Sequence, residues 1–245
     1  MHEAAVIMAA GKGTRMQSEL PKVCHRAADH QLVEWVVRAC RDAGIERIVV
    51  VVGYGRELVR AALAGYDVEF AVQEEQLGTG HAAMQAHQVL GDEPGRMFVF
   101  NGDMPLLDVA TIERLRTTHL AHDAEMTLAS MVPAQPYEYG RVIHGADGYV
   151  VDIVEERDCT PAQRVLRELN VGMYVFNRPA VWRVFAELGN ANKAGEYYIT
   201  DMARHCAQRG GRVVAVEVDE ETGLGVNTVE QLAHVEELLL ARQTV

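Results

Sequence analysis

The chain has 245 residues, of which 49% are hydrophobic and 24% are charged, and its formal net charge is −12 at pH 7. This composition is that of a globular protein with a substantial core, and it excludes long disordered segments. The negative charge argues against a nucleic-acid partner, because nucleic-acid phosphates are bound by clustered Lys and Arg side chains.

In the first half of the chain, short apolar runs alternate with segments of helical period. This alternation predicts β-α units and a mostly parallel sheet, which is an α/β fold. A first helix is expected to be capped by Asp29 and to end near Gly44, with an apolar face of Leu32, Val33, Val36, Val37 and Cys40. Strands are predicted at 4–8, 45–52, 68–72, 97–100 and 125–131, and further helices at 56–63, 79–90 and 108–119.

After about residue 136 the pattern becomes richer in strands. The segments YGRVI and YVVDIVEE flank an Ala-Asp-Gly turn at 146–148, which predicts a hairpin. A helix starting near Thr160 and Pro161 should precede a strand at 169–176. Helices are predicted at 179–188, 198–209 and 229–242, and a strand at 212–218. No internal repeat or low-complexity linker is present, so a single domain over 1–245 is the simplest architecture.

The stretch AAGKGTRM at 9–16 directly follows the first predicted strand. Ligands bind at this edge of α/β sheets, and two glycines allow backbone N–H groups to approach an anion closely. Between Gly11 and Arg26 lie four cations and one carboxylate, a local charge of +3. The pattern fits neither the P-loop nor the dinucleotide fingerprint, whose third glycine is Met16 here. From the residues alone, a phosphate-binding loop and a plain turn both remain open.

Three other segments contain candidate site residues. Pro21 restricts the backbone before Lys22, which is either a phosphate ligand or a solvated lysine. Asp103 follows a predicted strand, and near bound phosphates its charge would require a cation such as Mg²⁺; a capping role is the alternative. In QEEQLGTGHA, Gln73, Gln76 and Thr79 suit hydrogen bonding to a base edge, although a turn with Thr79 as the helix cap is also possible.

The default role of Asn227, in GVNT before the last predicted helix, is a helix N-cap. No Ser-His-Asp or Cys-His order and no HExxH spacing is present, so covalent catalysis is not indicated.

The cysteines and the hydropathy indicate the compartment. Cys24, Cys40, Cys159 and Cys206 lack CxxC spacing, so neither a zinc site nor a disulfide framework is expected. Free thiols are typical of a reducing compartment. No apolar run approaches the roughly 18 residues of a membrane span, and the N-terminus has no signal-peptide pattern. We therefore predict a cytoplasmic protein without membrane contact.

Several segments occur together in a diagnostic order, namely AAGKGTRM, ELPKV, QLGTGHA, GDMPL, YGRV, IVEERD, NVGMYVF, GEYYITD and GVN. From residue 4 to about 230 the chain resembles the nucleotidyltransferase half of bacterial N-acetylglucosamine-1-phosphate uridyltransferase. The first loop and ELPK are shared by many sugar-nucleotide pyrophosphorylases, whereas QLGTGHA and GEYYITD point to the uridyltransferase branch.

The resemblance implies a Rossmann-like fold of the nucleotide-diphospho-sugar transferase type, with a mostly parallel mixed sheet flanked by helices. It implies a nucleotide-binding half at 1–135, a β-rich sugar-binding half at 136–228 and a C-terminal helix at 229–245. The implied reaction is Mg²⁺-dependent transfer from UTP to N-acetylglucosamine 1-phosphate, which gives pyrophosphate and UDP-N-acetylglucosamine, a cell-wall precursor.

The resemblance also implies roles for individual residues. Arg15 and Lys22 would neutralise phosphate charge, and Asp103 and Asn227 would be catalytic as Mg²⁺ ligands. The implied substrate-binding residues are Met8, Ala9, Ala10, Gly11 and Gly13 in the first loop, Gln73, Gly78 and Thr79 around uracil, and Asn101, Gly102, Gly140, Glu155 and Asn170 toward the sugar.

The chain departs from the family pattern at three positions; the change at Met8 conserves volume and should be tolerated, whereas those at Asn101 and Val171, near the sugar pocket, leave the exact sugar open. Met8 stands where leucine is usual, Asn101 replaces a tyrosine or serine, and Val171 replaces a small or hydroxylated residue. One alternative is a related pyrophosphorylase that uses another sugar 1-phosphate, such as the N-acetylmuramic form, or another nucleotide. Another is a binding module without turnover. A nicotinamide oxidoreductase is disfavoured because Met16 breaks the fingerprint.

The family's acetyltransferase half is a β-helix of hexapeptide repeats, and this chain contains no such repeat. We therefore expect no acetyltransferase activity, and a monomer or weak homodimer in place of the trimer that the β-helix builds.

Overall fold

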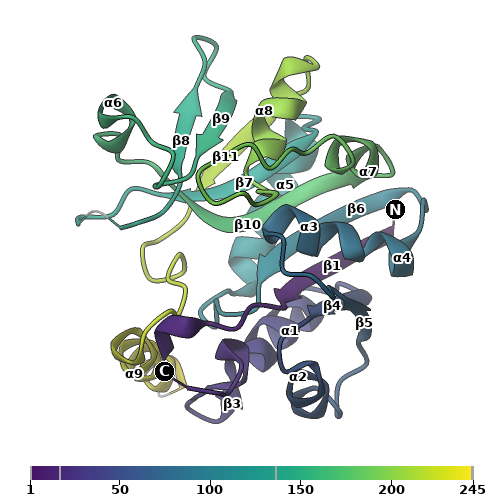
Figure 1. Ribbon diagram of the computed structural model, residues 1–245, viewed down its shortest axis with the longest axis vertical. Coiled ribbons are helices and arrows are strands. Elements are labelled where there is room, and N and C mark those ends of the chain that lie inside the picture. Colours follow the sequence, from purple (N-terminus) through teal and green to yellow (C-terminus); the bar gives the residue numbers. More distant parts are fainter. Residues whose placement is uncertain (1, 17, 136, 244–245) are drawn as a thin grey trace.

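The architecture was analysed in a computed structural model that describes residues 2–16, 18–135 and 137–243. Residue 136, where the β-rich half is predicted to begin, and residues 244–245 of the predicted C-terminal segment lie outside the described residues. Among the described residues, one sheet contains nine strands, and its main path has the order β11-β7-β10-β6-β1-β4-β5 (Figure 1). These seven strands are β1 (His2–Ala9), β4 (Arg47–Val52), β5 (Glu69–Val72), β6 (Gly95–Asn101), β7 (Met126–Met131), β10 (Leu169–Arg178) and β11 (Val213–Glu217).

The sheet is mixed but mostly parallel along this path. β1 pairs in parallel with both β4 and β6, and β5 and β11 also pair in parallel with their neighbours. β10 is antiparallel to β6 and β7. The hairpin of β8 (Arg141–His144) and β9 (Val150–Val154) joins the sheet through the start of β10. The predicted α/β fold, with a mostly parallel mixed sheet, is confirmed.

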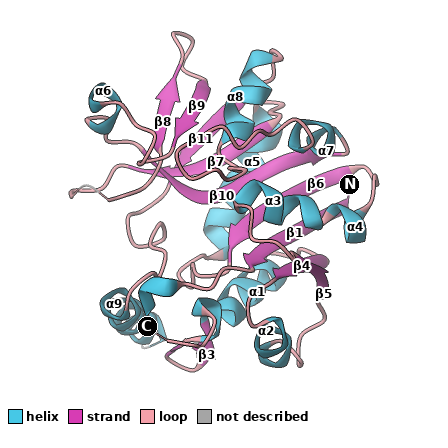
Figure 2. Ribbon diagram, viewed as in Figure 1, coloured by secondary structure: helices cyan, strands magenta, loops and turns pink. Residues whose placement is uncertain are grey.

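Helices cover both faces of the sheet (Figure 2). One face packs against α1 (Leu32–Asp42), α2 (Arg56–Ala62) and α5 (Val109–Ala121), and the other against α3 (Thr79–Gln85), α4 (His87–Leu90), α7 (Ala180–Phe185) and α8 (Asp201–Gln208). Alternate residues of β1 enter the two layers: Ala5 and Ile7 face one, Ala4 and Val6 the other. The remaining helices are α6 (Pro161–Arg164) and α9 (Val229–Gln243), with short 3-10 turns at Thr14–Met16 and Lys22–Cys24.

The start of α1 differs from the prediction that Asp29 caps it. The helix begins at Leu32 with Gln31 at the N-cap position, where the Gln31 N–H donates to Glu34 Oε2 at 2.7 Å. The short ribbon of β2 (Arg26–Ala27) and β3 (His30–Gln31), which was not predicted, occupies residues 26–31, so Asp29 lies in its turn. The predicted apolar face of α1 is confirmed, because all five of its residues are buried.

Three other helix predictions are wrong in their boundaries, and the one at 179–188 is the shorter α7, which ends at Phe185. The segment predicted as one helix at 79–90 is divided into α3 and α4 at Ala86. The helix predicted to start at residue 198 starts at Asp201. At α6 the prediction is confirmed, since Thr160 is the N-cap, Pro161 is the first helical residue, and Thr160 and Gln163 form a capping box.

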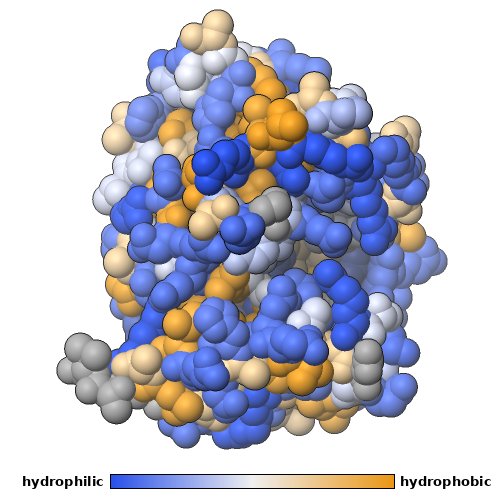
Figure 3. All heavy atoms as spheres, turned by 90° about the vertical axis from the view of Figure 1, so that its left-hand side faces the viewer, coloured by the Kyte–Doolittle hydropathy of each residue, from blue (hydrophilic) through white to orange (hydrophobic). Residues whose placement is uncertain are grey.

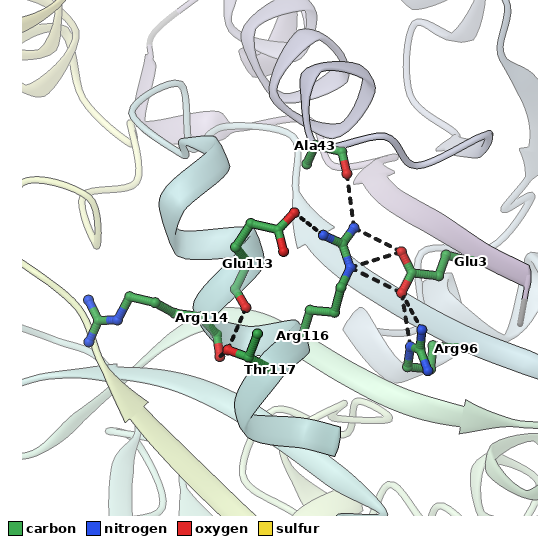
Figure 4. A network of polar contacts seen from close by, with 7 residues as sticks. All are labelled: Glu3, Ala43, Arg96, Glu113, Arg114, Arg116 and Thr117. Atoms are coloured by element: carbon green, nitrogen blue, oxygen red, sulfur yellow. Dashed lines mark hydrogen bonds and ion pairs between the residues drawn. The ribbon is translucent and has the colours of Figure 1, made fainter. Parts of the chain in front are cut away.

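A buried ionic cluster fixes the amino end of β1 (Figure 4). Glu3 accepts hydrogen bonds from Arg96 Nε at 2.9 Å and Arg116 Nε at 3.0 Å, and all three side chains are at most 14% exposed. Because β1 begins here, the cluster lies at the edge of the sheet opposite the carboxyl ends of β1 and β6.

Among the described residues, no helix combines the length and apolar character that a membrane crossing requires.

Candidate active site

Three adjoining hollows form a cleft at the edge of the sheet where β1 and β6 end. Their volumes are about 340, 300 and 840 Å³, and Lys22 and Thr79 line all three. Figure 3 shows the face of the molecule onto which these strand ends point, where hydrophilic residues border a hollow. The 340 Å³ hollow lies against the first loop and the 300 Å³ hollow against the β8–β9 side, so we call them the first-loop pocket and the hairpin pocket.

The first loop leaves β1 at Ala9 and is held by its neighbours. The Tyr54 N–H donates to the carbonyl of Ala10 at 3.0 Å. Gly13 has a φ of +69°, and a Cβ there would lie 2.5 Å from Cβ of Lys22, so glycine lets the Lys22 chain pass close by. Gly11 is exposed and no atom lies within 4 Å of its Cβ position, so its open side faces free space beside the first-loop pocket.

Four predicted residues from distant parts of the sequence meet where the two pockets join. Lys22 Nζ forms an ion pair with Asp103 Oδ2 and donates to Asn227 Oδ1 at 2.8 Å. Arg15 Nη2 donates to the same oxygen at 2.9 Å. The Lys22 and Asp103 side chains are only 17% and 13% exposed, so water screens their charges poorly.

Asn227 is not the N-cap of α9. Thr228 and Gln231 exchange hydrogen bonds at the start of that helix, and the Gln231 side chain also accepts from the Asn227 N–H. The helix start is therefore satisfied by its neighbours, and the Asn227 side-chain oxygen is left facing Lys22 and Arg15.

The first-loop pocket contains the predicted Met8, Ala9, Ala10, Gly11, Gln73, Gly78 and Thr79. Gln73 is 3% exposed, and its amide donates to the carbonyl of Gly78 at 3.1 Å, which fixes the loop between β5 and α3. Thr79 is the first residue of α3 and not its cap, and its hydroxyl accepts from the Ile199 N–H at 3.1 Å. QLGTGHA and GEYYITD are thus packed against each other.

The hairpin pocket contains the predicted Asn101, Gly140, Glu155 and Asn170. Asn170 is buried, and its amide donates to the Tyr174 hydroxyl at 2.8 Å. Glu155 Oε1 accepts from the Thr200 hydroxyl at 2.9 Å. Burial, opposed by that hydrogen bond, raises the pKa of Glu155 above its ordinary value.

Asn101 lies directly against a bulge of β10. The bulge falls between Asn170 and Tyr174, and its Gly172 has a φ of +82°. A Cβ on Gly172 would lie 2.2 Å from Asn101 Nδ2, so a side chain there would collide with Asn101. The glycine therefore gives Asn101 its place at the border of the two pockets.

Gly102 lines none of the three hollows within the described part of the chain. Its N–H donates to the carbonyl of Met8 at 2.9 Å, so it joins β6 to β1 just before Asp103. Gly13 and Arg15 line only the largest hollow.

Among the cleft residues that sequence reasoning missed, three are polar side chains of the two smaller pockets. Glu138 and Tyr139 line the hairpin pocket, and Glu196 lines the first-loop pocket. Tyr139 and Glu196 fall within YGRV and GEYYITD. These motifs indicated segments near the site but did not identify the two residues as part of it. Glu138 lies outside these motifs, and no sequence pattern singled it out.

The fold is of the nucleotide-diphospho-sugar transferase type. A solved UDP-glucose pyrophosphorylase in complex with UDP-glucose shares this fold, with a TM-score of 0.79 and 20% identity over 99% of this chain and 100% of that one. The apo form of UDP-glucose pyrophosphorylase gives 0.78 and 19%.

Residues 5–226 match the family described as the MobA-like NTP transferase domain, and the chain belongs to this family of nucleotidyltransferases. It is 45% identical over 240 residues to the bifunctional protein GlmU of Synechococcus sp. (strain JA-2-3B'a(2-13)), and 40% identical over 242 residues to that of Clostridium novyi (strain NT). These matches cover 98% and 99% of the chain but 37% and 53% of the relatives. The motifs indicated a resemblance to the nucleotidyltransferase half of the uridyltransferase. The matches confirm it for the part of GlmU that this chain covers.

Proposed function

We propose that the chain transfers a uridylyl group from UTP to N-acetylglucosamine 1-phosphate and releases pyrophosphate. The observation that carries the proposal is the cluster of Arg15, Lys22, Asp103 and Asn227, in which Lys22 and Asp103 line both pockets. A nucleotide in the first-loop pocket and a sugar phosphate in the hairpin pocket would meet at this cluster.

The chemistry requires no protein nucleophile. An oxygen of the sugar phosphate attacks the α-phosphorus of UTP, a new P–O bond forms, and the bond from the α-phosphorus to the bridging oxygen breaks as pyrophosphate leaves. Two anions must approach, so positioning and charge neutralisation supply the catalysis. Lys22 and Arg15 can provide positive charge at this point, and the Gly11 loop can present backbone N–H groups.

The residues present fit a Mg²⁺ ion held together with the nucleotide. Among the described residues, no group of three or more His, Cys, Asp or Glu side chains could hold a metal alone. Mg²⁺ is commonly bound by one or two protein oxygens together with substrate phosphates, and Asp103 and Asn227 offer one oxygen ligand each. The ion would neutralise charge on the phosphates. In this structure the Lys22 ammonium contacts an oxygen of each side chain, namely Asp103 Oδ2 and Asn227 Oδ1.

The hairpin pocket favours a neutral sugar ring. Its carboxylates, Glu138 and Glu155, can accept hydrogen bonds from sugar hydroxyls. They would repel the additional carboxylate of N-acetylmuramic acid 1-phosphate. This charge supports N-acetylglucosamine 1-phosphate over the N-acetylmuramic alternative.

The test is pyrophosphate release with Mg²⁺, with UTP, CTP, dTTP and ATP crossed against the 1-phosphates of N-acetylglucosamine, glucosamine, glucose and N-acetylmuramic acid. We expect the highest kcat/KM for UTP with N-acetylglucosamine 1-phosphate. A higher value for another pair would replace the substrate assignment, and no turnover with any pair would favour a binding module.

Asp103→Asn keeps the side-chain shape and removes the charge, so kcat should fall about 10²-fold or more. Asp108→Asn is the matched control, because Asp108 caps α5 through the Thr111 N–H at 2.8 Å and asparagine can cap equally well. Equal rates for the two variants would refute the role of Asp103.

A further inference from the structure

Tyr139 connects the wall of the hairpin pocket to the loop that carries Asn227. The Gly225 N–H donates to the Tyr139 hydroxyl at 3.1 Å, and Gly225 is buried. Tyr139 precedes Gly140 in the segment between β7 and β8. One hydroxyl thus joins two segments far apart in the sequence, one from the hairpin pocket and one from the cluster around Lys22.

A second bond holds the loop from the opposite side. The Val226 N–H donates to the backbone carbonyl of Asp103 at 2.9 Å. The loop of residues 225–227 is therefore fixed at two successive N–H groups, one bonded to Tyr139 and one to the segment of Asp103.

These contacts converge at Gly225. A Cβ built on Gly225 would lie 3.6 Å from the Tyr139 hydroxyl oxygen, 3.7 Å from Asp103 Oδ1 and 3.9 Å from Asn227 Nδ2. The phenol hydroxyl and both candidate metal-binding side chains thus surround one residue. A small displacement of Gly225 would change the separation of Asp103 and Asn227.

We propose that Tyr139 is a positioning residue whose hydroxyl holds loop 225–227 so that Asn227 and Asp103 face the same divalent cation. The inference rests on the proposed function, because that function assigns the cation to these two side chains. Tyr139 acts through the loop and takes no part in the bond-making step.

The segment that contains Tyr139 is itself held in place by hydrogen bonds and an ion pair. Its carbonyl accepts a hydrogen bond from Arg141, whose guanidinium is ion-paired with Glu156 at 2.7 Å. The neighbouring Gly140 carbonyl accepts from the Asn170 N–H at 2.8 Å. Burial raises the pKa of Tyr139, so the hydroxyl remains protonated and neutral at physiological pH. A fixed, neutral hydroxyl can locate a loop with precision, and the same segment lines the hairpin pocket.

Tyr137 provides a matched control. Its ring centroid is 5.6 Å from that of Tyr139, and its hydroxyl donates to Glu220 Oε1 at 2.8 Å. Tyr137→Phe likewise removes a phenol hydroxyl and breaks the hydrogen bond to Glu220, which precedes loop 225–227 in the sequence. It leaves the bond to Gly225 intact.

The test measures Mn²⁺ binding to the full chain by electron paramagnetic resonance, with and without UTP, for wild type, Tyr139→Phe and Tyr137→Phe. Mn²⁺ is the probe because it takes the oxygen ligands that Mg²⁺ takes. Loss of one neutral hydrogen bond should weaken Mn²⁺ binding by Tyr139→Phe about three- to tenfold. Tyr137→Phe should bind as wild type does.

The Mg²⁺ dependence of the initial rate gives a second readout. Tyr139→Phe should need about three- to tenfold more Mg²⁺ for half-maximal rate and should regain most of its kcat at saturating Mg²⁺. A purely structural defect would lower kcat at every Mg²⁺ concentration.

Equal Mn²⁺ affinities for wild type and Tyr139→Phe would overturn the proposal, as would equal losses in both variants. If wild type bound no Mn²⁺, the metal site and the role of Tyr139 would both be wrong. If wild type bound Mn²⁺ but formed no product from any substrate pair, the proposed reaction would fail, and the affinities would still decide the role of Tyr139.

Discussion

Gly172→Ala tests whether the bulge in β10 determines the position of Asn101. Gly172 has a φ of +82°, a left-handed conformation that costs an alanine about 1–2 kcal/mol. The new Cβ would also lie 2.2 Å from Asn101 Nδ2. Because that atom ends a flexible side chain, Asn101 can move aside, at a cost near the lower end of the roughly 1–3 kcal/mol for overpacking.

Gly210→Ala separates these two costs. Gly210 has nearly the same φ, +81°, but no atom lies within 4 Å of its Cβ position. The backbone strain and the lost flexibility of the unfolded chain should therefore be alike in the two variants. We expect Gly172→Ala to lose about 1 kcal/mol more unfolding free energy than Gly210→Ala. For a chain of this size the difference corresponds to about 2–4 °C in Tm.

The same displacement should change the substrate site. Asn101 borders the hairpin pocket, so we expect KM for the sugar 1-phosphate to rise about tenfold or more in Gly172→Ala, as for one added methyl group in a fitted pocket. Adding Asn101→Ala to Gly172→Ala should return the stability to that of Gly210→Ala. The assays are urea unfolding followed by circular dichroism and steady-state kinetics with each substrate varied in turn.

Equal stability of Gly172→Ala and Gly210→Ala, with an unchanged KM for the sugar 1-phosphate, would refute the contact between Gly172 and Asn101. Failure of the Asn101→Ala addition to restore stability would place the collision elsewhere.

Other properties follow from buried charges and thiols. Glu3→Gln should cost about 1.5–3 kcal/mol of unfolding free energy, measured by urea titration, because Arg96 and Arg116 lose the carboxylate that they share at largely buried positions, although Arg116 keeps its ion pair with Glu113, whereas Glu69→Gln in an exposed pair should cost about 0–1 kcal/mol. Similar costs would contradict the burial of the Glu3 cluster. Burial raises the pKa of Glu155, so its contribution to stability is full below its ordinary value of 4.5 and is lost as the pH rises through the raised value. Glu155→Gln should therefore gain stability relative to wild type as the pH rises from about 4.5 to 8, and a constant difference in thermal unfolding would contradict this. All four cysteines are buried, and burial raises the pKa of Cys24 to about 11, so the native chain should react slowly with a disulfide reagent and the unfolded chain quickly. Rapid reaction of the folded chain would refute this.

Most strands and helices could be predicted from the sequence because their apolar periods are strong. For example, the apolar face of α1 and the apolar run of β4 consist of side chains that are stable only in the core, and both are buried. The start of α1 could not be predicted, because Asp29 is a favoured N-cap residue and glutamine is not, yet Gln31 occupies the cap position. The β2–β3 ribbon decides between them, and pairing of two residues in each strand leaves too weak a pattern to detect.

The sequence indicated candidate residues of the site, but it could not show which of their side chains contact one another. Lys22, Asp103 and Asn227 could each be singled out, yet each retained an ordinary alternative, as a solvated lysine or a cap. Only the fold shows that the three side chains meet and that Thr228 and Gln231 satisfy the start of α9 in place of Asn227. The hydrogen bond between Gly225 and Tyr139 depends on loop geometry, for which the sequence carries no periodic signal.

The antiparallel direction of β10 explains why residues from both halves border one cleft. Parallel strands place their carboxyl ends at the ligand-binding edge, as β1 and β6 do with the first loop and Asp103. β10 runs the other way between β6 and β7, so Leu169 and Asn170 at its start lie beside the end of β7, and Gly172 lies against Asn101 at the end of β6. An amino end of one strand thus contributes Asn170 next to the carboxyl end that contributes Asn101. Two pockets can therefore share a border at one edge, and a reaction that joins two bound substrates requires such a border.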